Sequence, residues 1–372
     1  MKKKYPFKNL SLIFVAFIIL FVASCKKNNS SSTSVPTTAS PASIGLYEQD
    51  TLIYKVLFVA ITKIGTETVN DGLLFDTGSG GMVMDASELL PASNITNSGI
   101  KVTGDSLIVN GITVTNQTST IVYGADSATT FTVYGNLAYA PVTVGDETGN
   151  IVIKRVPFFL YYKATDASGN TDPVVGDWDT FGAAEIYGAT FPNNVNITSP
   201  LSYYDPGMGL TRGYKIAALG TQHFSSEGTF VPGVVTVGLT SSDLSSTSGF
   251  IFSQLYFDAN YDYYPQIPAK ITYGSKTFST GVVFDTGTNI YGLLEDPTFA
   301  GTSQDLPNGV SVTVAPTNGF SFTYTTNTAT NETIVENPYS SGGGVSVMGI
   351  DFFLNNEYLY DFIDHKLGLK NN

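Results

Sequence analysis

A short segment, Phe-Asp-Thr-Gly followed by a hydroxyl residue, occurs twice in the chain, each time at the end of an apolar run. The first copy lies in DGLLFDTGSGGMVMD (71–85) and the second in STGVVFDTGTNIYGLL (279–294). The two aspartates, Asp76 and Asp285, are 209 residues apart. That separation is too long for a small structural repeat, but it fits one copy in each of two related lobes. We therefore predict two lobes related by a pseudo-twofold axis.

The sequence around these copies is typical of strands. From Tyr47 onward, short apolar and β-branched runs alternate with Gly, Asn and Asp, which predicts strands and turns. Helical periodicity is brief, as in DASELL (85–90). Each copy is also followed by an apolar segment ending in glycine, Thr180-Phe181-Gly182 and Val347-Met348-Gly349. With 372 residues the chain can build two domains or one large β-rich unit, and we predict an all-β fold with a few short helices.

The first 45 residues have a different character. A lysine-rich start and the apolar run LSLIFVAFIILFVAS predict a signal peptide over 1–25. The run ends at Cys25, the only cysteine, in LFVASC, which resembles a bacterial lipobox. Residues 26–45 are rich in Ser, Thr and Pro and predict a flexible tether. We expect a disulfide-free protein that is lipid-anchored through Cys25 in a bacterial cell envelope, in the periplasm or at the outer-membrane surface. An uncleaved signal anchor is the alternative.

The charge balance excludes one class of partner. The chain has a formal net charge of −13, and six of its 18 Lys and Arg residues lie in 1–27, which leaves 12 against 31 acidic residues. A phosphate-binding surface has to be basic, so nucleic acid is not expected as a partner. The membrane is expected to be contacted through the lipid anchor only. A mildly acidic medium would reduce the self-repulsion of such a chain.

The two repeated turns have a specific chemical consequence if the lobes pack about the axis. Asp76 and Asp285 then meet, and two carboxylates in contact share one proton because both cannot ionise at low cost. Such a pair can act as a base through one member while the other donates a proton. A single Asp-Thr-Gly turn would be read as an ordinary turn-capping aspartate. Two copies in the same context favour a catalytic dyad.

The residues that follow each aspartate have predicted supporting roles. The glycines let the backbone approach the carboxylates and donate N–H groups. The threonines can bond across the lobes, and the hydroxyl residues after the glycines can bond the outer carboxylate oxygens. These six residues are Thr77, Gly78, Ser79, Thr286, Gly287 and Thr288.

At this point the sequence resembles the pepsin-like aspartic peptidases, and the resemblance runs through most of residues 46–372. Five segments occur in the family's order and approximate spacing: the opening hairpin, the flap segment, the strand returning from the flap, the start of the second lobe and the C-terminal block. In this sequence they are VLFVAITKIGTETVNDGLLFDTGS, TIVYG with Tyr123, FTVYGNLAYAPVTVG, GTFVPGVVTVGLTSSDL and VSVMGIDFFLNNEYLYDFIDHKLGL.

The resemblance implies a bilobal double-barrel fold with short helices and an active cleft between an N-terminal lobe (46–213) and a C-terminal lobe (214–372). It implies a monomeric aspartic endopeptidase acting at acid pH, with water activated by Asp76 and Asp285 and without a metal or cofactor. The substrate would be a polypeptide in extended conformation, held beneath a flap that carries Tyr123.

Two positions depart from the family pattern. Gly81 and Val83 stand where the family has Asn and the Trp that supports the flap tyrosine, and the only tryptophan, Trp178, is elsewhere in the sequence. Tyr134 is therefore a rival for the flap position. The tail Gly80-Gly81 is where the activity could have diverged.

Two other functions remain open. The same fold could serve as a catalytically inactive binding or inhibitor lipoprotein, which the altered flap support motivates. A two-carboxylate glycosidase is the third reading, but its carboxyls stand roughly 5 Å or more apart to flank a sugar. His223 and His365 have no ligand-spaced neighbours, so no metal site is predicted, and Asp351 is predicted to be structural.

Overall fold

The computed structural model describes residues 39–372, apart from 52–53, 124–129, 146–150, 172–175, 177, 193–194, 331 and 342–343. The predicted signal peptide, the lipidation site Cys25 and the tether up to residue 38 lie outside the described residues. The first strand begins at Ala42, so residues 42–45 of the predicted tether belong to that strand. Within the described part of the chain, no helix has the length and apolar character needed to cross a membrane.

Strands dominate the described residues, as predicted. Those before residue 240 are β1 (Ala42–Thr51), β2 (Tyr54–Ile64), β3 (Glu67–Asp76), β4 (Gly80–Asp85), β5 (Ile95–Thr96), β6 (Gly99–Ile100), β7 (Ser106–Val109), β8 (Ile112–Tyr123), β9 (Phe131–Gly145), β10 (Ile151–Thr165), β11 (Thr180–Ala183), β12 (Ala189–Phe191), β13 (Val195–Ile197), β14 (Thr211–Ile216) and β15 (Thr229–Leu239). The later strands are β16 (Ile251–Gln254), β17 (Phe257–Asp258), β18 (Asp262–Tyr263), β19 (Ile267–Tyr273), β20 (Lys276–Phe284), β21 (Gly292–Glu295), β22 (Ser303–Asp305), β23 (Ser311–Pro316), β24 (Phe322–Thr325), β25 (Thr333–Glu336), β26 (Ser346–Met348), β27 (Asn356–Asp361) and β28 (Lys366–Asn371).

The helices are short, again as predicted. They are α1 (Ala86–Leu89), α2 (Pro338–Ser341) and α3 (Ile350–Phe353), with 3₁₀ turns at Ala92–Asn94 and Pro200–Tyr203. The helix predicted from DASELL is α1. Asp85 caps it, because its side chain accepts a hydrogen bond from the Ser87 N–H at 2.7 Å.

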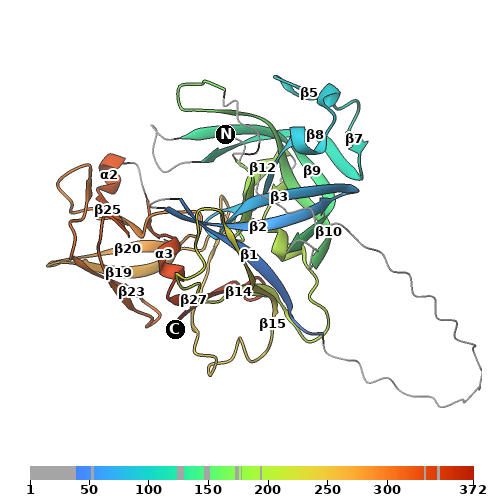
Figure 1. Ribbon diagram of the computed structural model, residues 1–372. Coiled ribbons are helices and arrows are strands. Elements are labelled where there is room, and N and C mark those ends of the chain that lie inside the picture. Colours follow the sequence, from blue (N-terminus) through green and yellow to red (C-terminus); the bar gives the residue numbers. More distant parts are fainter. Residues whose placement is uncertain are drawn as a thin grey trace, which may run out of the picture.

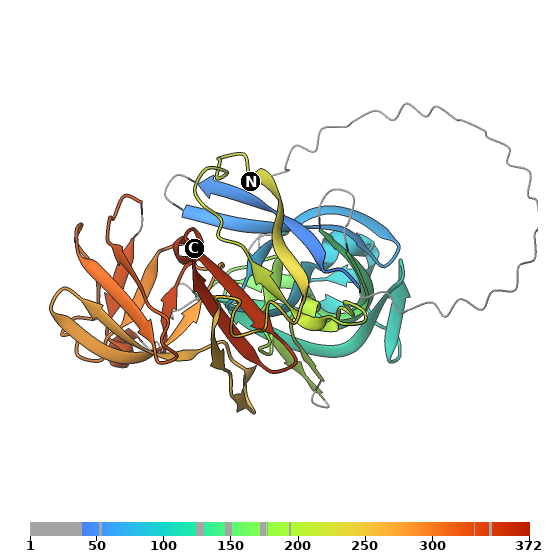
Figure 2. The same ribbon diagram turned by 90° about the horizontal axis from the view of Figure 1, so that it is seen from below.

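A long sheet runs through the molecule. Its strand order is β16-β28-β27-β14-β15-β1-β2-β3-β11-β4-β10-β9-β8-β7, and β2 also pairs with β9. That extra pairing closes β2, β3, β11, β4, β10 and β9 into a barrel. An eight-stranded sheet, β22-β25-β21-β26-β20-β19-β23-β24, forms the other β-rich lobe. Figures 1 and 2 place it on the opposite side of the molecule from β7–β10, with β1, β14, β15 and β27 between the two.

The strands between the lobes bear on the predicted domain limits. β14 contains the predicted boundary at 213/214, and it pairs with both β15 and β27. β15, which was expected to begin the second lobe, pairs with β1 from the start of the described chain. Both segments thus contribute to a sheet that connects the lobes, and the position at which the lobes divide stays a prediction.

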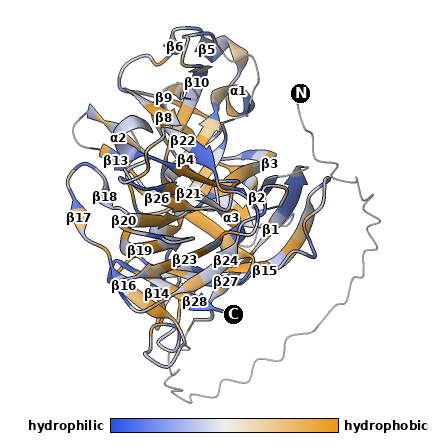
Figure 3. Ribbon diagram, turned by 90° about the vertical axis from the view of Figure 1, so that its left-hand side faces the viewer, coloured by the Kyte–Doolittle hydropathy of each residue, from blue (hydrophilic) through white to orange (hydrophobic). Residues whose placement is uncertain are grey.

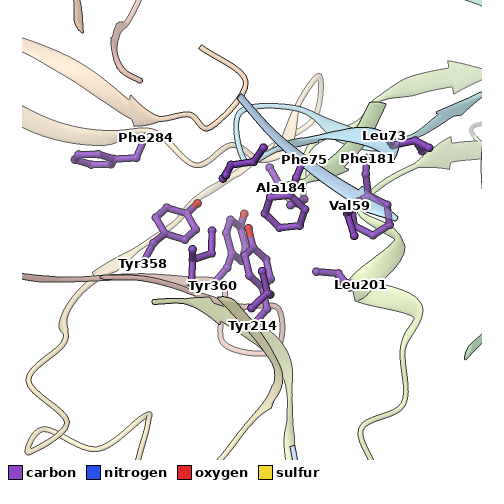
Figure 4. Packing of buried hydrophobic residues seen from close by; sticks show 14 of the residues in the cluster. Val59, Leu73, Phe75, Phe181, Ala184, Leu201, Tyr214, Phe284, Tyr358 and Tyr360 are labelled. Carbon is purple, nitrogen blue, oxygen red and sulfur yellow. The ribbon is translucent and has the colours of Figure 1, made fainter. Parts of the chain in front are cut away.

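Burial alternates along the strands as a one-sided sheet requires. In β19, for example, Ile267, Ala269, Ile271 and Tyr273 are buried while the residues between them are more accessible. Apolar residues colour many of the strands inside the molecule in Figure 3. Beneath the repeated turns the core is aromatic: Phe75, Phe181, Tyr214, Tyr358 and Tyr360 gather there (Figure 4) and each is fully buried. This packing fixes the strand ends that carry the two aspartates.

Candidate active site

The two aspartates occupy equivalent places in the two lobes. Asp76 is the last residue of β3, and Asp285 follows directly on β20. β3 runs parallel to β11, with Phe75 opposite Phe181, and β20 runs parallel to β26, with Phe284 opposite Met348. The two later apolar segments singled out in the sequence, 180–182 and 347–349, thus lie beside the two Asp-Thr-Gly turns in the same way.

Thr77 and Thr286 form a reciprocal set of hydrogen bonds across the lobes. The Thr77 N–H donates to Thr286 Oγ1 at 3.1 Å, and the Thr286 N–H donates to Thr77 Oγ1 at 3.0 Å. Each hydroxyl then donates to a carbonyl of the opposite lobe, Thr77 to Phe284 at 2.9 Å and Thr286 to Phe75 at 2.6 Å. Both threonines are buried. The predicted cross-lobe contact is present, and it holds the two turns in register.

The glycines bring backbone N–H groups onto the carboxylates. The Gly78 N–H is within hydrogen-bonding distance of Asp76 Oδ1 (2.8 Å) and of Asp285 Oδ1 (3.1 Å), so one donor faces both carboxyl groups. The Gly287 N–H donates to Asp285 Oδ1 at 2.8 Å. A Cβ on Gly78 would stand 2.4 Å from Asp285 Cγ, and one on Gly287 would stand 2.7 Å from Asp76 Cγ. Only glycine allows each turn to approach the opposite carboxyl this closely.

The environment of Asp76 favours its protonated form. Burial raises the pKa of Asp76 well above its ordinary range, and the charge of Asp285 and a hydrogen bond between the two carboxyls raise it further. Contacts with Ser79 and with the Gly78 N–H lower the pKa of Asp76. The carboxyls of Asp76 and Asp285 therefore lie beside each other, an arrangement that favours one shared proton over two ionised groups.

The two hydroxyl residues after the glycines differ in what they bond. Thr288 Oγ1 donates to Asp285 Oδ2 at 2.7 Å, as predicted. The Ser79 N–H donates to Asp76 Oδ1 at 3.0 Å. The Ser79 hydroxyl is close enough to lower the pKa of Asp76, yet it forms no hydrogen bond of ordinary geometry among the described residues. The hydrogen bonds of Ser79 and Thr288 are thus less symmetric than the matching positions of these residues in the sequence suggest.

Tyr123 lies near the dyad at the end of β8, where it pairs with Phe131 of β9. Burial raises the pKa of Tyr123, and the charge of Asp76 raises it further, which places the phenol close to that carboxyl. Tyr134, the rival, lies along the strands opposite Thr120 and Lys163, and the Lys163 ammonium lies over its ring at 4.2 Å. Of the two flap candidates, Tyr123 is thus the one favoured by the charge of Asp76 acting on its phenol, whereas its neighbour Gly124 lies outside the described residues.

Trp178 supplies the aromatic support that the sequence lacks at position 83. Its ring stacks on Tyr123, with centroids 6.2 Å apart and planes 16° from parallel, and it contacts Phe131 at 4.3 Å. Sequence reasoning missed this contact because Trp178 is 55 residues away from Tyr123 in the chain. The available signal was its position two residues before Thr180, the first residue of the strand that runs beside β3.

The glycine tail of the first turn has a packing reason. A Cβ on Gly80 would stand 1.9 Å from the Ile186 carbonyl oxygen. Gly81 has φ of +82°, and a Cβ there would stand 2.8 Å from Ile197 Cδ1. Glycine at position 81, where the family has Asn, thus goes with the close approach of Ile186 and Ile197 to the turn. The carboxyl of Asp76 still accepts from the Gly78 and Ser79 N–H groups.

Two further residues considered in the sequence are explained by nearby partners. Asp351 forms an ion pair with Lys55, Oδ1 to Nζ at 3.2 Å, which agrees with its predicted structural role. His365 stacks on Tyr263 and its Nδ1 lies 2.8 Å from Glu185 Oε2.

Comparisons with known proteins identify the fold. No protein-family model matches the chain, and no curated protein sequence matches it. Among solved structures, the aspartic proteinase from Irpex lacteus matches with a TM-score of 0.57 and 18% identity over 90% of this chain and 98% of that one. Basic 7S globulin from soybean matches with a TM-score of 0.55 and 9% identity over 89% and 96%. The predicted all-β, bilobal pepsin-like fold is confirmed.

Proposed function

We propose that this protein is an aspartic endopeptidase in which Asp76 and Asp285 activate water for attack on a peptide bond. The observation that carries the proposal is the contact between the two carboxyls, which face one shared N–H donor, that of Gly78. The fold alone does not decide the activity, because one structural neighbour is named as a proteinase and the other as a globulin. The proposal therefore rests on the chemistry of the pair.

The mechanism follows from a single proton shared by two acids. The ionised carboxyl takes a proton from a water held between the pair, and the protonated carboxyl donates to the oxygen of the scissile carbonyl. The backbone N–H groups of Gly78 and Gly287 stabilise the ionised form. No covalent intermediate is needed. An extended peptide would lie across the pair, beneath the β8–β9 hairpin that carries Tyr123.

The direction of the pH dependence follows from the raised pKa of Asp76. The singly protonated pair is the active form. As pH rises through the raised pKa, the shared proton is lost and with it the donor for the carbonyl oxygen. At the acid end both carboxyls become protonated and the base is lost. Activity is thus expected as a bell-shaped profile on the acid side.

The direct test is cleavage of an unfolded protein between about pH 3 and 6, the acid range around and above the ordinary pKa of a carboxyl group. We expect peptide-bond hydrolysis that a statine-type transition-state analogue inhibits and a metal chelator leaves intact. Tight peptide binding without turnover at any pH would contradict the proposal and favour the inactive binding protein. Cleavage of glycosidic bonds would favour a glycosidase, whose carboxyls usually stand roughly 5 Å or more apart.

The Trp178 stacking predicts a separate effect on substrate handling. Replacing Trp178 with alanine removes the ring that supports Tyr123. Because an aromatic pair contributes about 0.5–1.5 kcal/mol beyond its buried area, we expect kcat/KM to fall by about two- to twelvefold. Trp178→Phe keeps a stacking ring and should lose far less. The measurement is kcat/KM on a peptide substrate, and equal losses in both variants would show that stacking is not what matters.

A further inference from the structure

A second group of carboxyls lies in the N-terminal lobe, separate from the dyad. Asp71 of β3, Glu88 of α1 and Asp179, which precedes β11, each bring a carboxylate oxygen to within 4.8 Å of the others. Asp179 is only 6% exposed. These three residues, called here the acidic triad, come from segments far apart in the sequence, so the pattern of the chain gives no hint of them.

Within the triad, one oxygen of each buried or half-buried aspartate is held by the backbone and the other is left without an N–H or O–H donor. Asp71 Oδ1 accepts from the Gly72 N–H at 2.9 Å, and Asp179 Oδ1 accepts from the Asp85 N–H at 2.8 Å. Asp71 Oδ2 and Asp179 Oδ2 are buried and receive no hydrogen bond of ordinary geometry from a described N–H or O–H group, and the two carboxyl groups lie against each other. The backbone thus orients two unsatisfied carboxylate oxygens in the triad.

A third unsatisfied oxygen lies beside the triad and belongs to a different residue type. Tyr161 is 3% exposed, and its hydroxyl lies beside the Asp179 carboxyl and the Trp178 backbone without a hydrogen bond of ordinary geometry among the described residues. The charges of Asp179 and Asp85 bear directly on this phenol, so it faces the same polar site. Buried polar atoms without partners cost free energy and are uncommon in folded proteins, so three of them together favour a site that binds a ligand.

A ligand that fits this site has to be positively charged. Among the described residues, neither Asp71 nor Asp179 forms an ion pair with a Lys, Arg or His. Asp85 is not counted among the proposed ligands, because both of its carboxylate oxygens have hydrogen-bond donors. Its Oδ2 accepts from the Gly176 N–H at 3.3 Å, and its Oδ1 caps α1.

We propose that Asp71, Glu88 and Asp179 bind one divalent cation, calcium, and that this ion fixes Trp178 beneath Tyr123. Calcium is favoured because it takes oxygen ligands at 2.3–2.6 Å in flexible geometry. Oxygens up to 4.8 Å apart can therefore share one ion, whereas magnesium at 2.0–2.1 Å needs them closer. Trp178 directly precedes Asp179 in the chain. An ion bound to Asp179 therefore restrains the Trp178 ring, which stacks on Tyr123. Only this last step rests on the proposed function.

The chain offers a direct test, because Trp178 is its only tryptophan. Protein freed of metal by dialysis against a chelator is titrated with CaCl₂ at neutral pH while tryptophan emission is recorded, and bound calcium is counted by equilibrium dialysis. We expect one ion per chain and a saturable change in emission. Thermal unfolding should shift upward by roughly 5 °C at about a hundredfold excess over Kd. None of these measurements depends on peptidase activity.

Two variants and a matched control complete the test. Asp71→Asn and Glu88→Gln should each weaken calcium binding at least about tenfold and reduce the emission change. Glu88 is exposed and its variant is expected to fold even if the other does not. Asp105→Asn removes an exposed carboxylate of the same lobe and should bind calcium normally. The proposal is overturned if calcium does not bind, if neither variant weakens it, or if only acidification changes the emission, since a proton would then neutralise the triad.

Discussion

Asp76→Asn is expected to lower the rate of peptide hydrolysis by about 10²–10⁴-fold, the range typical of losing a positioned acid or base. The amide keeps the shape of the carboxyl. Its oxygen can still accept a hydrogen bond from the Gly78 N–H, which in the native protein donates to Asp76 Oδ1 at 2.8 Å. It cannot exchange a proton with Asp285, so the pair no longer supplies both a base and an acid. The measurement is kcat/KM for an unfolded protein or peptide substrate at the acid optimum.

Stability measurements separate this loss of activity from unfolding. The pKa of Asp76 is raised in the folded protein, so between the ordinary value of 3.8 and the raised value the folded state binds more protons than the unfolded state. The free energy of unfolding of the native protein therefore decreases as pH rises through that window. Asparagine does not ionise, so the variant lacks this decrease and should be at least as stable as the native protein at neutral pH.

An exposed aspartate provides the matched control for the activity assay. Asp105→Asn makes the same chemical change on the surface of the same lobe and should leave kcat/KM within about twofold of the native value, since surface substitutions usually have small effects. Full activity in Asp76→Asn would contradict the proposed function. A loss of equal size in both variants would point to a general effect of removing charge.

Local repetition explains what the sequence could predict. Each Asp-Thr-Gly turn follows an apolar strand and is matched by a later apolar segment ending in glycine, so the pairing of β3 with β11 and of β20 with β26 could be anticipated. The cross-lobe hydroxyl bonds of Thr77 and Thr286 follow once the two turns face each other. These features depend on short segments whose geometry is set by residue type.

The features that escaped prediction depend on contacts between segments with no common pattern. Trp178, two residues before β11, contacts Tyr123 at the end of β8 and Phe131 at the start of β9, which are distant from it in the sequence. The acidic triad joins residues of β3, α1 and the approach to β11. The prediction of no metal site rests on the absence of a Cys, His or acidic cluster at ligand spacing in the sequence, and it stays a prediction; such spacing does not report on carboxylates that only the fold brings together. The lack of a hydrogen bond from the Ser79 hydroxyl is likewise a matter of side-chain rotation, which residue type leaves open.

Thr286→Val is expected to lower the free energy of unfolding by about 2–6 kcal/mol. Valine has nearly the same shape but lacks the hydroxyl that accepts from the Thr77 N–H at 3.1 Å and donates to the Phe75 carbonyl at 2.6 Å. Both backbone groups would be left buried and unpaired, at a cost of about 1–3 kcal/mol each. Because these bonds join the lobes beside the dyad, activity should fall as well. The measurement is urea unfolding in the acid range, where Asp76 retains its proton.

Thr286→Ser is the matched control, because serine retains the hydroxyl and loses only a methyl group. It should cost less than about 1.5 kcal/mol and keep most of the activity. Thr77→Val removes the equivalent hydroxyl from the other lobe, which accepts from the Thr286 N–H at 3.0 Å and donates to the Phe284 carbonyl at 2.9 Å. Since the two threonines form one network, the double variant should lose less than the sum of the single losses. Equal unfolding midpoints for the valine and serine variants at position 286 would mean that these bonds do not hold the lobes together, and strict additivity would mean that each threonine acts alone.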